Sequence, residues 1–217
     1  MKVSMTAEEG VTKFDLSFTP SLPLPRRRVQ ALIVWRDILR RLGLVGQDPA
    51  RYGGVGFGNL SRRLSTKSAV TGLRFTITGT QTGALPALDA HHFAIVIACD
   101  WRDNHVRAEG PIAPSSESLT HAMLYHLDPS IGFVFHVHSS EIWQARTALN
   151  LPTTAPEVAY GTPAMAEEMQ RLWHTGALAR RHIVAMAGHE DGVIGFGRSA
   201  DQAGMALLRA LVRALSR

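Results

Sequence analysis

Two histidines separated by one residue, His136 and His138, are the side chains best suited to chemistry in this sequence of 217 residues. They end an apolar segment that predicts a strand over 131–139. Because side chains alternate across a strand, both imidazoles project from one face, with Phe135 and Val137 on the other. Two imidazoles so placed can bind one metal ion such as zinc. The simpler alternative is a half-buried strand whose histidines only form hydrogen bonds.

A metal site needs further ligands, and His189 is the best distant candidate. It follows a predicted buried strand and lies between Gly188 and Gly192, which allow sharp turns and a close backbone approach. The alternative is a polar loop residue beside a strand end. The remaining histidines are expected to be structural or exposed: His91, His92, His105, His121, His126, His174 and His182.

A possible anion site lies at Ser115 and Ser116, directly before a helix predicted over 117–127. Free N–H groups at a helix start favour anions, and the two hydroxyls add donors. The simpler interpretation is a serine N-cap. Glu117 is then either an exposed acid that favours the helix dipole or a general base beside the metal.

Two glycine-containing segments offer further backbone amides to an anion. One carries Asn59 and Ser61 in the sequence Gly-Asn-Leu-Ser, and the other carries Thr82 and Gly83 at the end of Thr-Gly-Thr-Gln-Thr-Gly. Such turns are common, so neither segment is specific by itself.

The elements that must position these residues alternate between strands and helices. Apolar periodicity, caps and breakers predict helices over 26–42, 117–127, 141–149, 163–178 and from Ser199 onward, and strands over 73–78, 93–99, 104–109, 131–139 and 182–187. Gly43 is expected to end the first helix, and Thr162 with Pro163 to begin the fourth. Residues 1–25, rich in proline near their end, are expected to form an extended N-terminal segment before a single domain over 26–217. Interleaved strands and helices predict a layered α/β domain.

Composition excludes several classes of protein. Apolar residues make up 45% and charged residues 19%, which is ordinary for a globular chain and excludes a disordered one. The single cysteine, Cys99, excludes intrachain disulfides and cysteine-rich zinc modules. No apolar run approaches the ~20 residues that span a bilayer, and Lys2 is not followed by an apolar signal segment, so a cytoplasmic location is expected. The net charge of +5 comes mostly from scattered arginines, which favours a solvated basic surface and attraction of small anions over nucleic-acid binding.

In this order, the pieces resemble the class II aldolase/adducin family, which includes metal-dependent sugar-phosphate aldolases such as L-fuculose-phosphate aldolase. The resemblance runs from about residue 26 through the last helix, and the combination of its motifs is specific. It implies a three-layer α/β/α domain with a central mixed sheet, commonly a homotetramer with sites between subunits.

The resemblance also implies residue roles. It assigns the substrate phosphate to Asn59, Thr82, Gly83, Ser115 and Ser116, a zinc ion or another divalent metal to His136, His138 and His189, and acid/base catalysis to Glu117.

Three features depart from the family pattern. The family's third histidine directly precedes a glycine, so counting back from Gly192 makes Asp191 a competitor of His189. The segment 151–161 lacks a match for the tyrosine that donates a proton from a neighbouring subunit of the fuculose-phosphate enzyme, although Tyr160 is nearby. Thr78-Gly79 competes with Thr82-Gly83 for one anion-binding position.

These residues predict a zinc-dependent aldolase-type lyase acting on a small phosphorylated or carboxylated sugar-like substrate. An aldolase stabilises an enediolate through a lysine Schiff base or a metal, and the only lysines, Lys2, Lys13 and Lys67, lie outside the predicted buried strands. The alternatives are an epimerase or dehydratase on the same metal site, a non-catalytic interaction protein of the adducin kind, and a nucleic-acid-binding protein.

Overall fold

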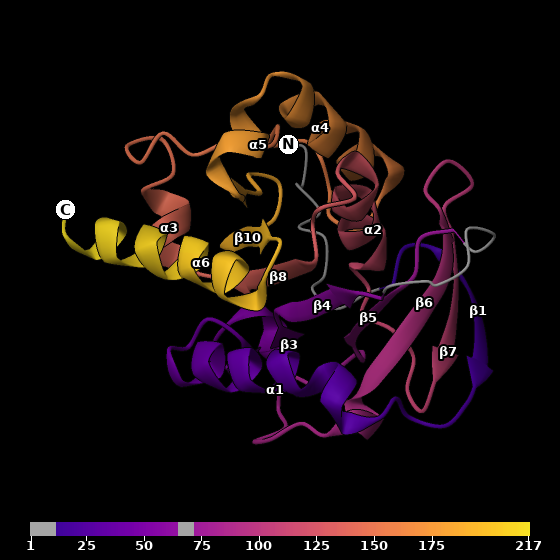
Figure 1. The fold of residues 1–217 in the computed structure, drawn as a ribbon. Coiled ribbons are helices and arrows are strands. Elements are labelled where there is room, and N and C mark those ends of the chain that lie inside the picture. The colour runs from indigo at the N-terminus through magenta and orange to yellow at the C-terminus, as the bar shows by residue number, and fades with distance from the viewer. Residues whose placement is uncertain (1–11, 65–71) are drawn as a thin grey trace.

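The computed structural model describes residues 12–64 and 72–217, so Lys2, Lys67 and the expected absence of a signal segment lie outside the described residues. Figure 1 shows the fold. The helices are α1 (Arg26–Arg41), α2 (Ser118–Leu127), α3 (Ser140–Gln144), α4 (Pro163–His174), α5 (Ala177–Arg181) and α6 (Ala200–Leu215), with short 3-10 turns at Tyr52–Gly54 and Ala90–His92. The strands are β1 (Asp15–Pro20), β2 (Gly46–Gln47), β3 (Gly56–Phe57), β4 (Asn59–Arg63), β5 (Phe75–Thr78), β6 (Phe93–Asp100), β7 (His105–Gly110), β8 (Phe133–His138), β9 (Ile183–Ala185) and β10 (Gly192–Gly197).

The described residues form a central sheet of eight strands, in the order β1-β7-β6-β5-β4-β8-β10-β9. The sheet is mixed, because β1 pairs with β7 in parallel and the other neighbours pair antiparallel. β8 lies between β4 and β10, with His136 opposite Asn59 on one side and Ile194 on the other. The paired strands β2 and β3 form a separate small sheet.

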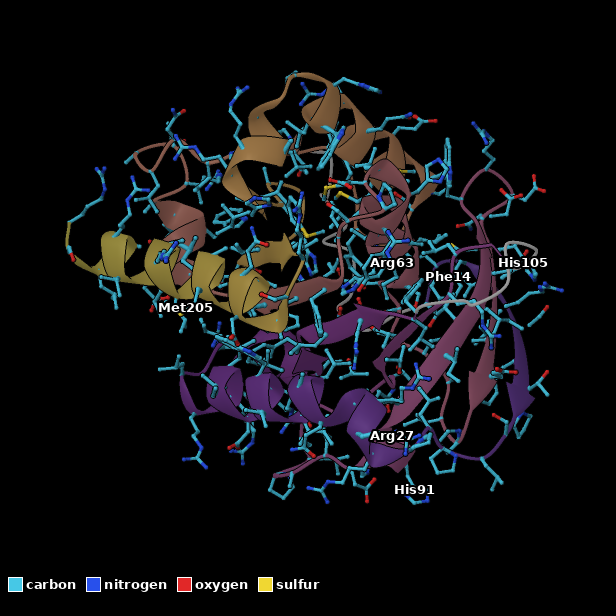
Figure 2. All side chains as sticks on the ribbon, viewed as in Figure 1. Phe14, Arg27, Arg63, His91, His105 and Met205 are labelled. Atoms are coloured by element: carbon cyan, nitrogen blue, oxygen red, sulfur yellow. The ribbon has the colours of Figure 1, made fainter. Side chains whose placement is uncertain are left out.

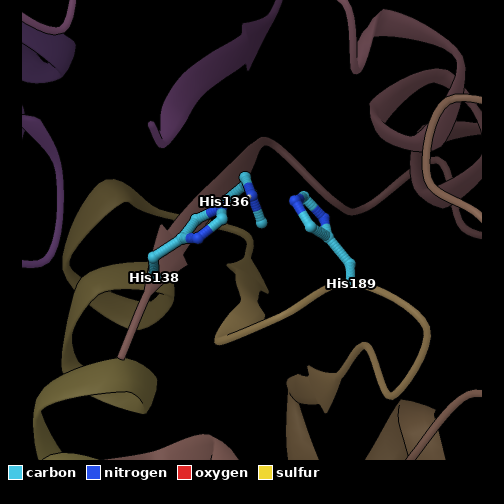
Figure 3. Close-up of side chains that lie close together, drawn as sticks. All are labelled: His136, His138 and His189. Carbon is cyan, nitrogen blue, oxygen red and sulfur yellow. Dashed lines mark hydrogen bonds between the residues drawn. The ribbon is translucent and has the colours of Figure 1, made fainter. Parts of the chain in front are cut away.

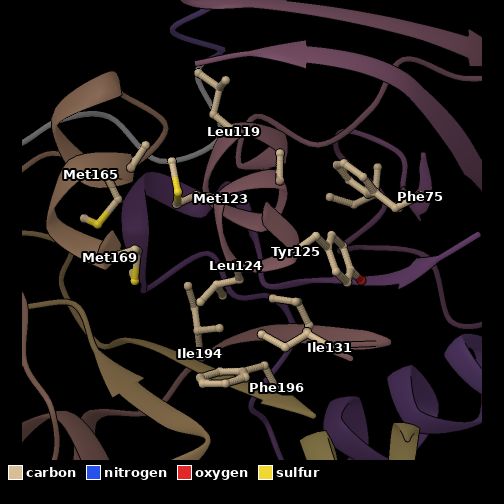
Figure 4. Close-up of a cluster of buried hydrophobic side chains, with 14 of the residues drawn as sticks. Phe75, Leu119, Met123, Leu124, Tyr125, Ile131, Met165, Met169, Ile194 and Phe196 are labelled. Atoms are coloured by element: carbon tan, nitrogen blue, oxygen red, sulfur yellow. The ribbon is translucent and has the colours of Figure 1, made fainter. Parts of the chain in front are cut away.

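Two buried apolar clusters pack against opposite faces of the sheet and make three layers (Figure 1). One cluster joins the sheet to α2, α4 and α5, and Figure 4 shows its methionine and aromatic side chains around Tyr125. The other joins the sheet to α1, α3 and α6. Along β8, Val134 belongs to the first cluster, whereas Phe135 and Val137 belong to the second. The predicted α/β/α layering and the predicted alternation along this strand are therefore confirmed.

Figure 2 shows His91 and His105 at the periphery of the molecule. His105 Nε2 lies 2.9 Å from Ser17 Oγ on the neighbouring strand β1. No helix among the described residues has the length and apolar character that a membrane crossing would need.

The predicted elements are mostly present, with differences at glycines and at short strands. The helix expected over 163–178 is divided into α4 and α5, because Gly176 adopts a left-handed conformation with φ 72°. The helix expected over 141–149 is only α3, followed by turns. Sequence analysis missed β1, β4 and β10 as strands. β1 makes part of the expected N-terminal extension an edge strand of the sheet.

Candidate metal centre and anion pocket

His136 and His138 lie side by side at the end of β8, with both side chains fully buried. Their Nε2 atoms are 3.1 Å apart, and the two rings meet edge to face with centroids 4.9 Å apart. The fold places them on the α2 face of the sheet, because Val134 on that face packs in the cluster with α2. Both histidines therefore point to one place, as their spacing predicted.

His189 reaches the pair from the turn between β9 and β10. The turn folds tightly, because the His189 amide donates to Met186 O at 3.1 Å and the Gly192 amide donates to His189 O at 2.9 Å. Gly188 is required within it, since a Cβ atom there would lie 2.3 Å from the carbonyl oxygen of Val158. The pairing of Gly192 with His138 then brings the turn beside the end of β8.

Figure 3 shows the three rings facing one another, and we call His136, His138 and His189 the imidazole cluster. One candidate ligand nitrogen from each ring lies within 4.8 Å of the others. The His189 ring stacks on His136 with centroids 5.1 Å apart and meets His138 edge to face.

The imidazole cluster fits a divalent metal. Two nitrogens at ~2.0–2.1 Å from tetrahedral zinc are separated by ~3.3 Å, close to the 3.1 Å between the two Nε2 atoms here. Burial lowers the pKa of His138 well below its usual value, and the charges of His189, His136 and Arg51 act in the same direction. The low pKa favours the neutral imidazole, which is the form that binds a metal. Three imidazoles form a donor set that zinc accepts in catalytic sites, where a fourth position stays open.

Glu117 contacts the imidazole cluster directly. It is only 1% exposed, and its Oε1 lies 2.9 Å from His136 Nε2. Asn59 Nδ2, from the neighbouring strand β4, donates to the same oxygen at 3.4 Å. Burial by itself would raise the pKa of Glu117, but the interactions with His136, His189 and His121 outweigh it and lower the pKa. The interpretation of Glu117 as an exposed helix acid is therefore wrong, and its carboxylate lies against the imidazole cluster.

A small pocket opens between β4, the loop that follows β5 and the start of α2. All five residues assigned to the substrate phosphate line it: Asn59, Thr82, Gly83, Ser115 and Ser116. Part of Ser115 is used within the turn, where its Oγ accepts from the Glu117 amide at 3.3 Å and its carbonyl oxygen accepts from Ser118 Oγ at 2.7 Å. Thr82 Oγ1 likewise donates to Gly79 O at 3.0 Å. The pocket therefore lies next to the catalytic candidate Glu117 and is lined by the polar side chains of Asn59 and Ser116.

The two competing threonine–glycine pairs occupy different positions. Thr82 and Gly83 line the pocket, whereas Thr78 Oγ1 accepts from the Leu60 amide at 3.2 Å and Thr78 does not line it. Gly79 lines the pocket as well. The geometry thus favours Thr82-Gly83 over Thr78-Gly79 as the pair that lines the anion pocket. The two pairs were hard to separate in the sequence because Gly79 and Gly83 belong to one loop and both line the pocket.

Arg36 supports this loop and was missed in the sequence. Its guanidinium Nη2 donates to the carbonyl oxygens of Thr82 and Gly83, each at 3.0 Å. Arg36 is 2% exposed. Its burial lowers the pKa of the guanidinium, and the charge of Arg40 lowers it further. The available signal was its position on the buried stripe of α1, between Leu32 and Leu39.

Asp191, the competitor for the third ligand position, is engaged elsewhere. Tyr52 OH donates to Asp191 Oδ2 at 2.7 Å, and Arg51 Nη2 donates to Tyr52 OH at 2.5 Å. The Tyr52 ring packs edge to face on His138 at 4.5 Å between centroids. Sequence analysis missed Tyr52, whose only signal was an aromatic residue in a glycine-rich segment. His189, rather than Asp191, joins the other two histidines.

Tyr160 packs on His189, whereas Tyr52 packs on His138. Its ring stacks on His189 with centroids 4.4 Å apart and an interplanar angle of 24°. Lys13 lies over the same ring, with Nζ 3.6 Å from the centroid, and donates to Tyr160 O at 3.3 Å. A lysine thus lies closer to the cluster than its sequence position suggested, although it faces Tyr160 rather than the anion pocket.

Comparisons with known proteins define the class of protein. The family model of the Class II Aldolase and Adducin N-terminal domain matches residues 50–214. The chain therefore belongs to the class II aldolase/adducin family.

Similar solved structures have the same fold at low sequence identity. A sugar-phosphate aldolase from Thermotoga maritima is 14% identical with a TM-score of 0.63, and the alignment covers 88% of this chain and 96% of that one. An L-fuculose-1-phosphate aldolase from Thermus thermophilus is 18% identical with a TM-score of 0.61, covering 88% and 93%. YgbL from Escherichia coli, a candidate aldolase, epimerase or decarboxylase, is 16% identical with a TM-score of 0.63, covering 88% of each chain. A search of the curated proteins finds no match.

Proposed function

We propose that this protein is a zinc-dependent aldolase-type lyase that cleaves or forms a carbon–carbon bond in a small phosphorylated or carboxylated sugar-like substrate. One observation carries the proposal: three buried imidazoles and the buried carboxylate of Glu117 meet beside a small pocket that Asn59, Ser116 and the Thr82-Gly83 loop line. Membership of a family that contains sugar-phosphate aldolases supports it.

Each part of the site has a role in such a reaction. His136, His138 and His189 would hold the metal, which when bound acts as a Lewis acid on a carbonyl and supports enediolate chemistry. Ser116, Asn59 and the Thr82-Gly83 loop would bind the anionic end of the substrate. Glu117 would take up and return the proton, because its Oε1 lies beside the nitrogen that faces the metal position.

The same residues would also serve an epimerase or a dehydratase, which is our second candidate. YgbL, a similar structure, carries a name that includes an epimerase and a decarboxylase among its candidate activities. A non-catalytic interaction protein is less well supported, because such a protein has no need of three buried imidazoles and a buried carboxylate at one place. We further propose a homotetramer in the cytoplasm, as the family resemblance implies.

The proposal is tested by proton exchange followed by bond cleavage. Zinc-loaded protein should exchange a carbon-bound proton of a ketone phosphate such as dihydroxyacetone phosphate with deuterated solvent, as observed by NMR. Glu117→Gln should retain zinc and ligand but lower the exchange rate by ~10²-fold or more, because a general base is lost. Glu167→Gln, an exposed position on α4, is the matched control and should leave the rate unchanged.

Two results would contradict the proposal. The first is wild-type exchange that persists unchanged in Glu117→Gln. The second is zinc-loaded wild-type protein that neither exchanges the proton nor cleaves any member of a panel of sugar phosphates and sugar acids. Inversion of a carbon centre without cleavage would favour the epimerase.

A further inference from the structure

A second buried polar cluster lies under the start of α2, and its three members, Ser61, His121 and Tyr125, are here called the Ser61 cluster. Ser61 Oγ lies 2.7 Å from His121 Nδ1 and 2.7 Å from Tyr125 OH. Ser61 and His121 are fully buried and Tyr125 is 1% exposed. A purely structural role explains the contact of His121 Nδ1 with Ser61, but it leaves the buried Nε2 without a hydrogen-bond partner in the part of the chain that the structure describes.

The contacts within the Ser61 cluster allow a proton arrangement that leaves an N–H on the far side of the His121 ring. Tyr125 OH and Ser61 Oγ lie 2.7 Å apart, and either can donate. Where Tyr125 donates to Ser61, Ser61 donates to His121 Nδ1 at 2.7 Å, a far shorter contact than the one to Val134 O at 3.4 Å. An imidazole that accepts at Nδ1 and is neutral carries its proton on Nε2. Burial supports the neutral form, because it lowers the pKa of His121 to about 3.

His121 Nε2 is buried and has no hydrogen-bond partner among the described residues, so in this proton arrangement its N–H is an unused donor. Glu117 lies one helical turn earlier, and its Oε2 is a buried acceptor without a hydrogen-bond partner among the described residues. Its other oxygen, Oε1, contacts His136 and Asn59. The His121 amide donates to Glu117 O at 3.2 Å, so the two residues are i,i+4 neighbours at the start of α2. The two side chains form no hydrogen bond with each other. Buried polar groups are almost always satisfied, often by ordered water, so a leftover donor and acceptor one helical turn apart are expected to share a buried water.

We propose that His121 is a positioning residue for Glu117, and that one buried water links His121 Nε2–H to Glu117 Oε2. The chain of donors then runs from Tyr125 through Ser61 and His121 to the carboxylate. It holds Oε2 away from the cluster and leaves Oε1 to face the metal and the substrate. The kinetic part rests on the proposed function, whereas the hydrogen-bond part does not.

The hydrogen-bond part is tested by NMR of the ring protons in zinc-loaded protein. Long-range proton–nitrogen spectra should show His121 as the Nε2–H tautomer, with a downfield proton that exchanges slowly with water. Glu117→Gln should move this proton upfield, because a neutral amide is a weaker acceptor than a carboxylate. An Nδ1–H tautomer, or a ring proton unmoved by Glu117→Gln, would overturn the proposal whether or not the protein proves to be an aldolase.

The kinetic part is tested with two substitutions of different donor capacity. His121→Leu should lower kcat by ~10–100-fold with little change in KM, the usual scale for losing a group that orients another. His121→Gln returns an N–H donor near the Nε2 position and should recover part of that loss. His126→Gln, an exposed position on the same helix, is the control. Equal kcat in His121→Leu and His121→Gln, at matched thermal stability, would overturn a positioning role.

Discussion

Two buried clusters on the same face of the sheet hold histidines in opposite situations. In the Ser61 cluster, donors and acceptors alternate, and contacts of 2.7 Å link a phenol, a hydroxyl and an imidazole. In the imidazole cluster, like groups meet: Nε2 faces Nε2 at 3.1 Å, and the Nδ1 of His136 has no hydrogen-bond partner among the described residues.

The contrast separates a structural cluster from a binding site. The ring nitrogens of His136 and His138 face each other, and His136 Nε2 also faces Glu117 Oε1, so one cation at this point would be bound by several of these groups together. Buried histidines alone are therefore not the signal. The signal is the convergence of several imidazole nitrogens and a carboxylate on one point.

The largest expected effect is the loss of the metal. His136→Ala or His138→Ala should lower bound zinc from about one ion per chain to nearly none, because two ligands rarely retain zinc. The fold should survive, since the β8 core residues Phe135 and Val137 lie on the opposite face of the sheet. Elemental analysis with circular dichroism measures both. A variant that keeps its zinc would contradict the assignment of that histidine.

A smaller effect distinguishes the third ligand. His189→Ala should weaken zinc affinity by more than ~10-fold, because it removes a ligand. Asp191→Ala should change the affinity less, since Asp191 contacts Tyr52 and Arg51 rather than the other histidines. Competition with a chromogenic chelator gives both affinities. The reverse order would support the alternative ligand Asp191.

The pH dependence of the free energy of unfolding tests whether His121 stays neutral in the folded protein. The pKa of His121 is about 3 in the folded protein, below the ~6.5 of an unfolded chain, so the unfolded state binds more protons between these values. Stability should therefore fall as the pH drops from ~6.5 towards 3, with His121 contributing up to ~1.4 kcal/mol per pH unit.

Urea unfolding of metal-free protein between these pH values measures that slope. His121→Gln should reduce it by about one proton, whereas His126→Gln should not. An unchanged slope in His121→Gln would show that the imidazole is not held neutral.

The smallest expected effect concerns the anion pocket. Ser116→Ala should weaken binding of inorganic phosphate by ~2–10-fold, the scale of one hydrogen bond. Isothermal titration calorimetry can compare it with Ser199→Ala, whose hydroxyl caps α6 far from the pocket. Phosphate affinity that is unchanged in the Ser115, Ser116 and Asn59 alanine variants alike would place the anion elsewhere.

Much of this arrangement could be predicted from the sequence, because it depends on local rules. The alternation along β8 placed His136 and His138 on one face, and the serines before α2 marked its beginning. The order of these motifs then indicated the family, which supplied Asn59 and Thr82 as neighbours of the pocket.

What could not be predicted depends on contacts between distant segments. Arg36 and Tyr52 lie in a helix and a glycine-rich segment with no local sign that they face the site. The sequence favoured His189 over Asp191 as the third ligand, but the competition could be examined only in the turn before β10, a strand that the sequence did not indicate. The position of Glu117 likewise depends on burial, which arises where the start of α2 packs against β4 and β8.

The proposed function depends above all on His136, His138 and His189 binding one divalent metal ion. The most direct test is elemental analysis of wild-type protein after zinc reconstitution, with X-ray absorption spectroscopy at the zinc edge. We expect about one zinc per chain with three imidazole nitrogens at ~2.0–2.1 Å. No stoichiometric metal after reconstitution, or a bound metal without imidazole ligands, would contradict it.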